Sequence, residues 1–209
     1  MTEASITALG NLRTPNSFEW YLVPFLALVI YAYSLEVRSG HWDRVITGIG
    51  FFGGELIWEM FNALVLHFTQ YAALWTVSGK SVFLIFVGLN VEIALMFALA
   101  PLALFNALPA DRGRKILGLS NRIVIPVCFG LFCVMVEILL NRWGALAWAY
   151  RWWSWPNVWL IIIAYSGPFT FIAWFNDRVS LKNKAFAAAA CWALAGIGFV
   201  VFAVFLRWI

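Results

Sequence analysis

An apolar run from Val45 to Phe68 constrains this chain more than any other feature, because it is long enough to cross a bilayer as a helix. At about 100° per residue, Glu55, Glu59 and Asn62 fall within about 60° of arc on one helix face, over roughly 10 Å. A carboxylate at membrane depth is costly, so it normally faces the protein interior and normally has a function. The run therefore predicts a membrane helix with a buried polar face.

The composition also indicates a membrane protein. Hydrophobic residues make up 64% of the chain and charged residues 11%, with a mean hydropathy of +0.86, whereas an average soluble domain is roughly 25% charged. The apolar runs are continuous rather than alternating, which favours helices over a barrel. We predict an all-α fold, a polytopic membrane helical bundle that forms one integral membrane domain over residues 1–209. Six transmembrane helices are expected, at about residues 18–35, 45–68, 81–108, 123–141, 158–175 and 185–208.

The lysines and arginines indicate the orientation of the bundle. The loops after the first, third and fifth predicted spans hold Arg38, Arg44, Arg112, Arg114, Lys115, Arg122, Arg178, Lys182 and Lys184. The opposite side holds Arg13, Lys80, Arg142, Arg151 and Arg207. Because cytoplasmic loops carry the excess of basic residues, both termini are expected outside, in a bacterial inner (plasma) membrane. Topology accounts for the formal charge of +4, so no nucleic-acid partner is expected.

A weak two-fold internal repeat relates the two halves of the chain. At an offset of 78 residues, Glu59 aligns with Glu137 and Trp75 with Trp153. Each half reads as a span with a glutamate, an aromatic outer loop and a span with a polar middle. Parallel repeats of this kind are related by an axis along the membrane normal.

Four glutamates lie inside the predicted spans, without a lysine or arginine inside any of the same spans: Glu55, Glu59, Glu92 and Glu137. Because burying four unpaired anions would be prohibitive, most should be neutral acids or hydrated in a cavity. A neutral carboxylic acid in an apolar pocket can donate a proton. Any one of them could instead be an interhelical hydrogen bond, worth about 0.6 kcal/mol. For the whole set, a functional site is favoured.

We therefore predict a catalytic set with Glu59 as the acid and Glu55 or Glu92 as the proton relay, all facing one enclosed cavity. Asn62 would orient the acid, and Trp and Phe faces would stabilise a developing carbocation. The residues expected to bind the substrate are Asn62, Trp58, Asn90, Trp75, Glu137 and Asn141. No metal or cofactor is expected, since the sequence has no His-rich cluster, no Gly-rich phosphate loop followed by Lys and no Asp-x-x-Asp motif.

Two resemblances involve these residues. The first resemblance is to a pattern in uncharacterised bacterial multi-span membrane proteins. This chain looks like that pattern at Trp58-Glu59-Met60-Phe61-Asn62, at Trp75-Thr76-Val77 and at Phe86-Val87-Gly88 leading to Glu92. It covers the second and third spans. The Trp58-Glu59 context is also similar to the transmembrane meroterpenoid cyclases, in which an intramembrane glutamate acts in protonating a prenyl group. That family pairs its glutamate with a later acidic residue in another span, and here Asp177 lies at a span edge.

Three classes of function fit these observations. The first is an integral membrane enzyme that protonates an isoprenoid or similar lipid, and so cyclises, hydrates or isomerises it without a cofactor. The second is a non-catalytic pigment- or lipid-binding scaffold subunit, docked to a membrane-protein partner through the Trp-rich outer loop from Arg142 to Asn157. That loop reads either as an interfacial belt or as an aromatic lid over a cavity. The third is a proton-coupled transporter, which is less favoured because the spans hold no cation for an anion site.

Overall fold

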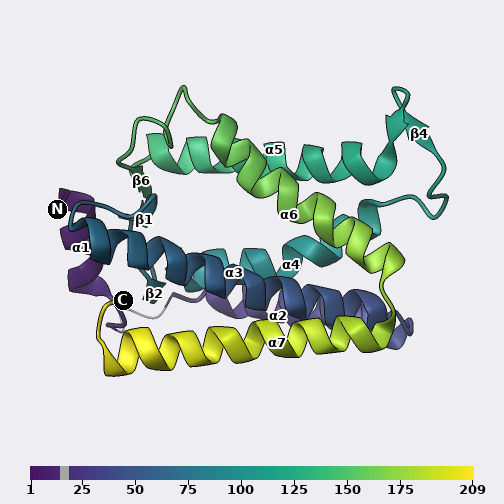
Figure 1. The fold of residues 1–209 in the computed structure, drawn as a ribbon, viewed down its shortest axis with the longest axis horizontal. Coiled ribbons are helices and arrows are strands. Elements are labelled where there is room, and N and C mark those ends of the chain that lie inside the picture. The colour runs from purple at the N-terminus through teal and green to yellow at the C-terminus, as the bar shows by residue number, and fades with distance from the viewer. Residues whose placement is uncertain (15–18) are drawn as a thin grey trace.

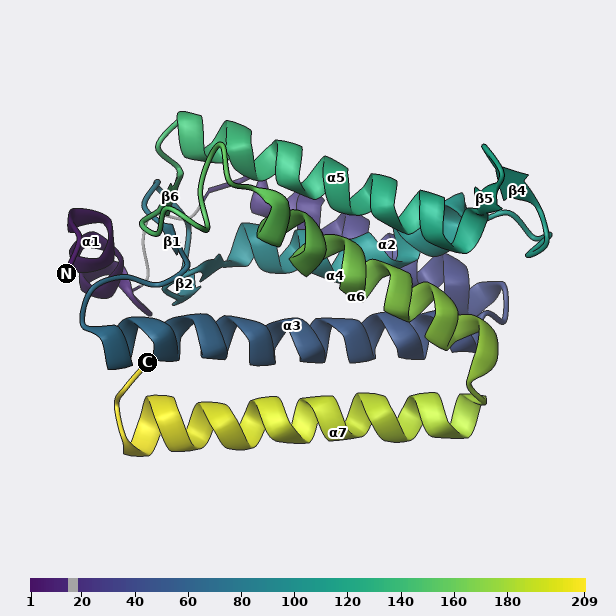
Figure 2. The ribbon, with the colours of Figure 1, turned by 45° about the horizontal axis from the view of Figure 1, so that its top comes forward.

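The computed structural model describes residues 1–14 and 19–209, which form a bundle of helices lying roughly side by side (Figures 1 and 2). The fold is 67% helical, which confirms the predicted all-α class. The helices are α1 Glu3–Asn11, α2 Leu22–Arg38, α3 Trp42–Thr69, α4 Val91–Ala107, α5 Asn121–Arg142, α6 Trp159–Arg178 and α7 Leu181–Phe199, and the π-helix η1, Val200–Phe205, continues α7.

The segments between the helices contain short antiparallel strand pairs. β1 (Trp75–Val77) pairs with β6 (Leu146–Trp148), β2 (Leu84–Phe86) with β3 (Leu89–Asn90), and β4 (Lys115–Ile116) with β5 (Leu119–Ser120). The β1–β6 pair connects the loop after α3 to the loop after α5. The two halves of the chain are thereby joined at one end of the bundle.

Local sequence signals explain where several helices begin and end. The side chains of Asn90, Ser120 and Ser180 each accept a hydrogen bond from a backbone N–H in the first turn of the helix that follows. Short polar side chains of this kind satisfy N–H groups that have no partner inside the helix. At the other end of α3, Gln70 adopts the left-handed conformation with φ of 50°, which terminates the helix.

The helices α2 to α7 correspond to the six predicted spans. Four of them, α3, α5, α6 and α7 with η1, are long and apolar enough to cross a membrane by length and composition. The apolar α4 is shorter, and both α2 and α4 have 17 residues, so the number of spans stays a prediction. The predicted start of the first span, at residue 18, lies outside the described residues. Helix α1 was not predicted.

The prediction of a third span over residues 81–108 is wrong in its first part. Residues 84–90 form the β2–β3 hairpin, and α4 begins at Val91. The hairpin strands are buried, with Leu84, Phe86 and Leu89 at most 3% exposed. Because strands buried on both faces are apolar throughout, the hairpin and the helix form one continuous apolar run in the sequence.

The helices pack as two groups. α3 lies along α7 and also packs on α4, while α5 lies along α6. Helix α6 crosses over the first group and leads into the start of α7, as Figure 2 shows. Both termini lie at one end of the bundle, and the β4–β5 hairpin lies at the opposite end (Figure 1). The candidate site residues lie where α6 crosses α3 and α4.

Candidate functional site

Asn62 fixes the loop after α3 against the helix. Its side chain is fully buried, donates from Nδ2 to the carbonyl of Trp75 at 2.8 Å, and accepts at Oδ1 from the N–H of Leu74 at 2.8 Å. An amide that is hydrogen-bonded on both sides holds the backbone in one place. Asn62 therefore positions the β1 strand, and with it the indole of Trp75, over the acidic face of α3.

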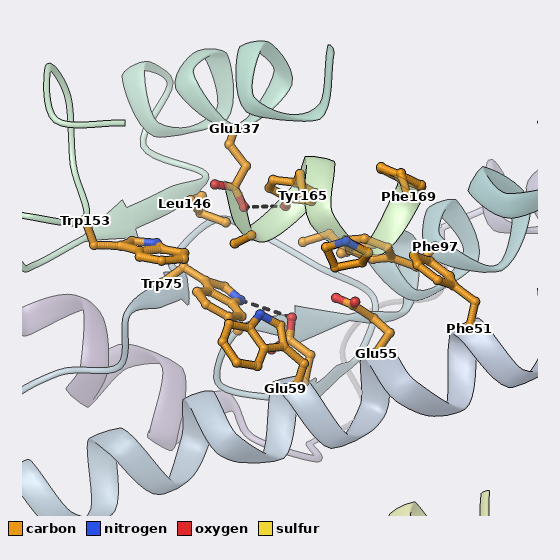
Figure 3. Close-up of a pocket in the computed structure, with 15 residues that line it drawn as sticks. Phe51, Glu55, Glu59, Trp75, Phe97, Glu137, Leu146, Trp153, Tyr165 and Phe169 are labelled. Carbon is orange, nitrogen blue, oxygen red and sulfur yellow. Dashed lines mark hydrogen bonds between the residues drawn. The ribbon is translucent and has the colours of Figure 1, made fainter. Parts of the chain in front are cut away.

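Glu59 is bound on one oxygen only. The indole Nε1–H of Trp75 donates to Oε1 at 3.0 Å, as Figure 3 shows. Oε2 is buried without a hydrogen-bond partner among the described residues, and the whole residue is 1% exposed. A buried polar atom without a partner is costly, so such an atom in a folded protein calls for a functional or structural explanation.

Glu137 repeats this arrangement from the other side. The hydroxyl of Tyr165 on α6 donates to Oε1 of Glu137 on α5 at 2.7 Å, and Oε2 is again buried without a partner among the described residues. The carboxyl groups of Glu55 and Glu59 from α3 and of Glu137 from α5 point into the same space (Figure 3). We call this space the carboxyl chamber.

The carboxyl chamber is small and has aromatic walls. Its volume is about 40 Å³, enough for roughly three or four water molecules, since each needs about 10–15 Å³. The ring of Trp75 stacks on Trp153, with 5.6 Å between centroids, and lies 6.0 Å from the ring of Trp58. Besides the three glutamates, its wall includes Phe51, Trp58, Trp75, Phe97, Trp153, Tyr165 and Phe169. Their π faces surround the acids with an environment that suits a transient cation.

Two apolar clefts flank the chamber. The larger, of about 570 Å³, lies between α3, α6 and α7, and it shares Glu55, Trp58 and Pro168 with the chamber. We call it the α3–α6–α7 cleft. The smaller, of about 280 Å³, lies between α4, α5 and α6, and it shares Glu137 and Tyr165 with the chamber. Glu59 lines the chamber but neither of the two clefts. The three acids therefore face three different surroundings.

The structure places Glu92 away from the other acids, which corrects the prediction of one shared cavity. Glu92 lies in the first turn of α4, where its carboxylate accepts from the Tyr21 hydroxyl at 2.6 Å, from Ser81 at 2.8 Å and from the Val82 N–H at 3.1 Å. The helix begins ten residues later than predicted, at Val91, so Glu92 occupies its N-terminus, where an acidic side chain is favourable.

The asparagines of the predicted set hold the backbone in place. Asn90 caps α4 through the N–H of Ile93, at 2.8 Å. Asn141 donates to the carbonyl of Leu146 at 3.0 Å and so supports β6. Like Asn62, each bonds main-chain atoms, and neither lines the carboxyl chamber.

Asp177 has no place in the chamber. It forms ion pairs with Arg122, at 2.7 Å, and Arg112, at 3.4 Å, next to the β4–β5 hairpin. The later acid that faces the glutamates of α3 is Glu137. Sequence reasoning missed Tyr165 and Phe97, which come from α6 and α4, and did not place Trp153 at the site. Among the described residues, no group of three His, Cys, Asp or Glu side chains is arranged to hold a metal ion.

The comparison with protein families identifies this chain as a membrane protein. The profile of a family described as "Uncharacterized membrane protein family" matches residues 2–204. An uncharacterized protein from Archaeoglobus fulgidus is 38% identical over 209 residues, which cover 100% of this chain and 99% of the relative. No solved structure matches the chain. The match over nearly the full length means that the carboxyl chamber lies wholly within the family's shared region.

Proposed function

We propose that this chain, which belongs to the uncharacterized membrane protein family, is an enzyme that protonates a carbon–carbon double bond of an isoprenoid or similar lipid. The position of Glu55 carries the proposal, because its side chain lines both the carboxyl chamber and the α3–α6–α7 cleft. A lipid chain in the cleft would reach Glu55, while Glu59 stays enclosed behind it. Glu55 is thus the residue at which the acidic chamber meets the apolar cleft that would hold the substrate.

In the proposed step, the O–H bond of Glu55 breaks as the π electrons of the double bond form a new C–H bond. The neighbouring carbon becomes a cation, which the faces of Trp58 and Phe51 can stabilise, since both rings line the cleft and the chamber. Loss of a proton from the next carbon gives an isomer. Attack by a second double bond, followed by loss of a proton from the new cation, gives a ring, and addition of water with loss of one of its protons gives an alcohol. In each case the released proton restores the carboxyl group of Glu55, directly or through Glu59 and Glu137.

Glu59 and Glu137 act in this proposal as the proton store for Glu55. The Oε2 atoms of both residues have no hydrogen-bond partner among the described residues, and the chamber has space for a few water molecules. Such water molecules could pass protons between the acids. Trp75 and Tyr165 hold the two stores in position, each through one hydrogen bond to Oε1. The acid role expected for Glu59 therefore passes to Glu55, because Glu59 does not line either apolar cleft.

Deuterium transfer tests this function without knowledge of the substrate. The purified protein is incubated in D₂O with the total lipid extract of its host, and the lipids are analysed by mass spectrometry. We expect one lipid class to gain carbon-bound deuterium, alone for isomerisation or cyclisation, or together with an OD group for hydration. Glu55→Gln should reduce this gain by about a hundredfold or more, because an amide cannot supply the proton.

A matched set of variants separates chemistry from packing. Glu92→Gln changes the same residue type outside the chamber and should leave deuterium transfer unchanged. Glu59→Gln should slow the transfer and preserve the fold, whereas Glu59→Leu should also lower the thermal midpoint. Membrane abundance is measured for each variant. If folded wild-type protein transfers no deuterium to any host lipid, the enzyme proposal is wrong.

A lipid-binding scaffold is the second candidate, and the exposed tryptophans of the Trp-rich outer loop favour it. Trp143 is 73% exposed and Trp155 is 57% exposed, which suits docking to a membrane-protein partner or the interface. A scaffold would bind lipid in the cleft but transfer no deuterium. Glu55→Gln would then have no effect on the host phenotype.

A further inference from the structure

The two charged side chains that line the α3–α6–α7 cleft lie apart along its length. Glu55 lies toward one end, and Thr47 and Lys184 lie at the other, with Phe51 between Thr47 and Glu55 on α3. Thr47 and Glu55 are eight residues apart on α3, which corresponds to about 12 Å along the helix. Phe171, also in the wall, is 55% exposed, so the cleft can be reached from the outer surface of the bundle.

Lys184 is a buried cation at the end of this cleft. Sequence reasoning assigned it to a loop, but α7 begins at Leu181, and Lys184 is 3% exposed in the first turn. Its Nζ donates to the carbonyl of Asn176 at 2.6 Å and lies 3.8 Å from Oδ2 of Asp43, beyond hydrogen-bond distance. An ammonium carries three protons, so Lys184 retains capacity for a further acceptor.

The surroundings of Lys184 favour a negative ligand. Asp43 forms an ion pair with Lys184 but is 44% exposed, so water screens its charge, and Asp177 is the other carboxylate that acts on this ammonium. Arg178 and Lys182 lie on the neighbouring ends of α6 and α7. Transfer of a buried ammonium out of water is costly unless an acceptor compensates, and the anionic head of a lipid can supply that acceptor.

We infer that the α3–α6–α7 cleft binds a single-chain lipid anion, such as a fatty or isoprenoid acid, with its head on Lys184 and its chain directed to Glu55. This inference rests on the proposed function only for the chemistry at Glu55. It adds the substrate class and its direction of binding. The rise between Thr47 and Glu55 puts the reacting carbon roughly 12 Å from the head group.

The test uses cis-parinaric acid, a fluorescent fatty acid, with the purified full-length protein in neutral detergent. Excitation of tryptophan should give saturable probe emission, since Trp58 lines the cleft. Palmitic acid should displace the probe at least about tenfold better than hexadecanol, a difference of about 1.4 kcal/mol. Lys184→Met should abolish this preference for the acid, and Lys184→Arg should retain it.

Glycine substitutions test the location. A Cβ added at Gly54, which lines the cleft, meets nothing within 4 Å, so Gly54→Leu should fill the cleft and abolish probe binding. Gly196 on α7 has the same open space and does not line the cleft, so Gly196→Leu is the matched control and should bind normally. Cys191 lines the cleft as well, and palmitate should slow its alkylation in a Cys128→Ser, Cys133→Ser background.

Each result decides the inference. The inference is overturned if hexadecanol displaces the probe as well as palmitic acid does, or if Lys184→Met keeps the preference for the acid. It is also overturned if palmitate does not protect Cys191 from alkylation, a measurement that needs no cleft-filling variant. Failure of the enzyme proposal gives a different pattern, in which palmitate binds through Lys184 but no lipid gains deuterium. Glu55→Gln, conversely, should keep probe binding and lose deuterium transfer.

Discussion

Trp75 and Trp153 stack with 5.6 Å between their ring centroids, although they belong to the two loops that follow α3 and α5. The hydroxyl of Tyr150 also donates to the carbonyl of Ala72, at 2.9 Å and at the same offset of 78 residues. Trp75 and Trp153 both line the carboxyl chamber, so their stack forms part of its wall. The aromatic outer loops, which read as an interfacial belt or a lid, contribute Trp75 and Trp153 to the wall of a site.

Replacing each indole with phenyl should separate the hydrogen bond from the stack. Trp75→Phe removes the donor to Glu59 and should lower the free energy of unfolding by about 1–3 kcal/mol, because a second buried oxygen then lacks a partner. Trp153→Phe is the control, since its Nε1 has no partner among the described residues. Thermal midpoints in detergent measure both. Equal losses would mean that stacking, rather than the hydrogen bond, supports Glu59.

Helical periodicity predicted one part of the site well. Glu55 and Glu59 share a face because they are four residues apart on α3, and that relation needs no knowledge of the other helices. The repeat drew attention to Glu137 in the same way. Both signals depend on spacing within or between similar segments, and the structure brings all three acids to one chamber.

The remaining parts depend on tertiary packing that spacing does not record. Tyr165 reaches Glu137 because α6 packs along α5, and no pattern in the sequence pairs these two residues. Glu92 was misplaced because a buried hairpin and a helix are both apolar. Lys184 was assigned to a loop because a lysine near a span edge is usually solvated.

The orientation of the bundle can be tested at the β4–β5 hairpin. Leu117 is 96% exposed there, and Trp143, on the opposite side in the predicted topology, is 73% exposed. In a background without the three native cysteines, a membrane-impermeant maleimide should label Trp143→Cys in intact cells and leave Leu117→Cys unlabelled. Labelling of Leu117→Cys without permeabilisation would reverse the predicted topology.

Stability should fall in acid because of Glu36, at the end of α2. Burial alone would raise the pKa of Glu36, but hydrogen bonds from Asn106 and His41 and the charge of Arg44 lower this pKa below its usual value. A carboxyl with a lowered folded-state pKa stabilises the fold above its unfolded pKa, about 4.3, and this stabilisation is lost as the pH falls through the folded value. Thermal midpoints measured from neutral to acid pH should fall less steeply for Glu36→Gln than for the wild type.

The last prediction concerns Gly88, in the β2–β3 hairpin beneath the chamber. A Cβ at this position would clash first with Nδ2 of Asn62, and it would lie 2.5 Å from Nε1 of Trp75 and 2.7 Å from Oε2 of Glu59, closer than real Cβ contacts. Gly88→Ala should therefore separate the two side chains and destabilise the fold by about 1–3 kcal/mol.

Gly167→Ala is the matched control, because an added Cβ on α6 meets nothing within 4 Å there. That change should be neutral or slightly stabilising, since alanine is the better helix former by about 1 kcal/mol. Chemical denaturation in mixed micelles gives both values, and tryptophan emission should shift only for Gly88→Ala, as the indole of Trp75 leaves Glu59. If Gly88→Ala is as stable as the wild type, Glu59 can move aside, and the chamber is not rigidly held by the hairpin. The bare oxygen of Glu59 would then be free to turn toward the α3–α6–α7 cleft, and Glu59 rather than Glu55 could be the acid that meets the lipid.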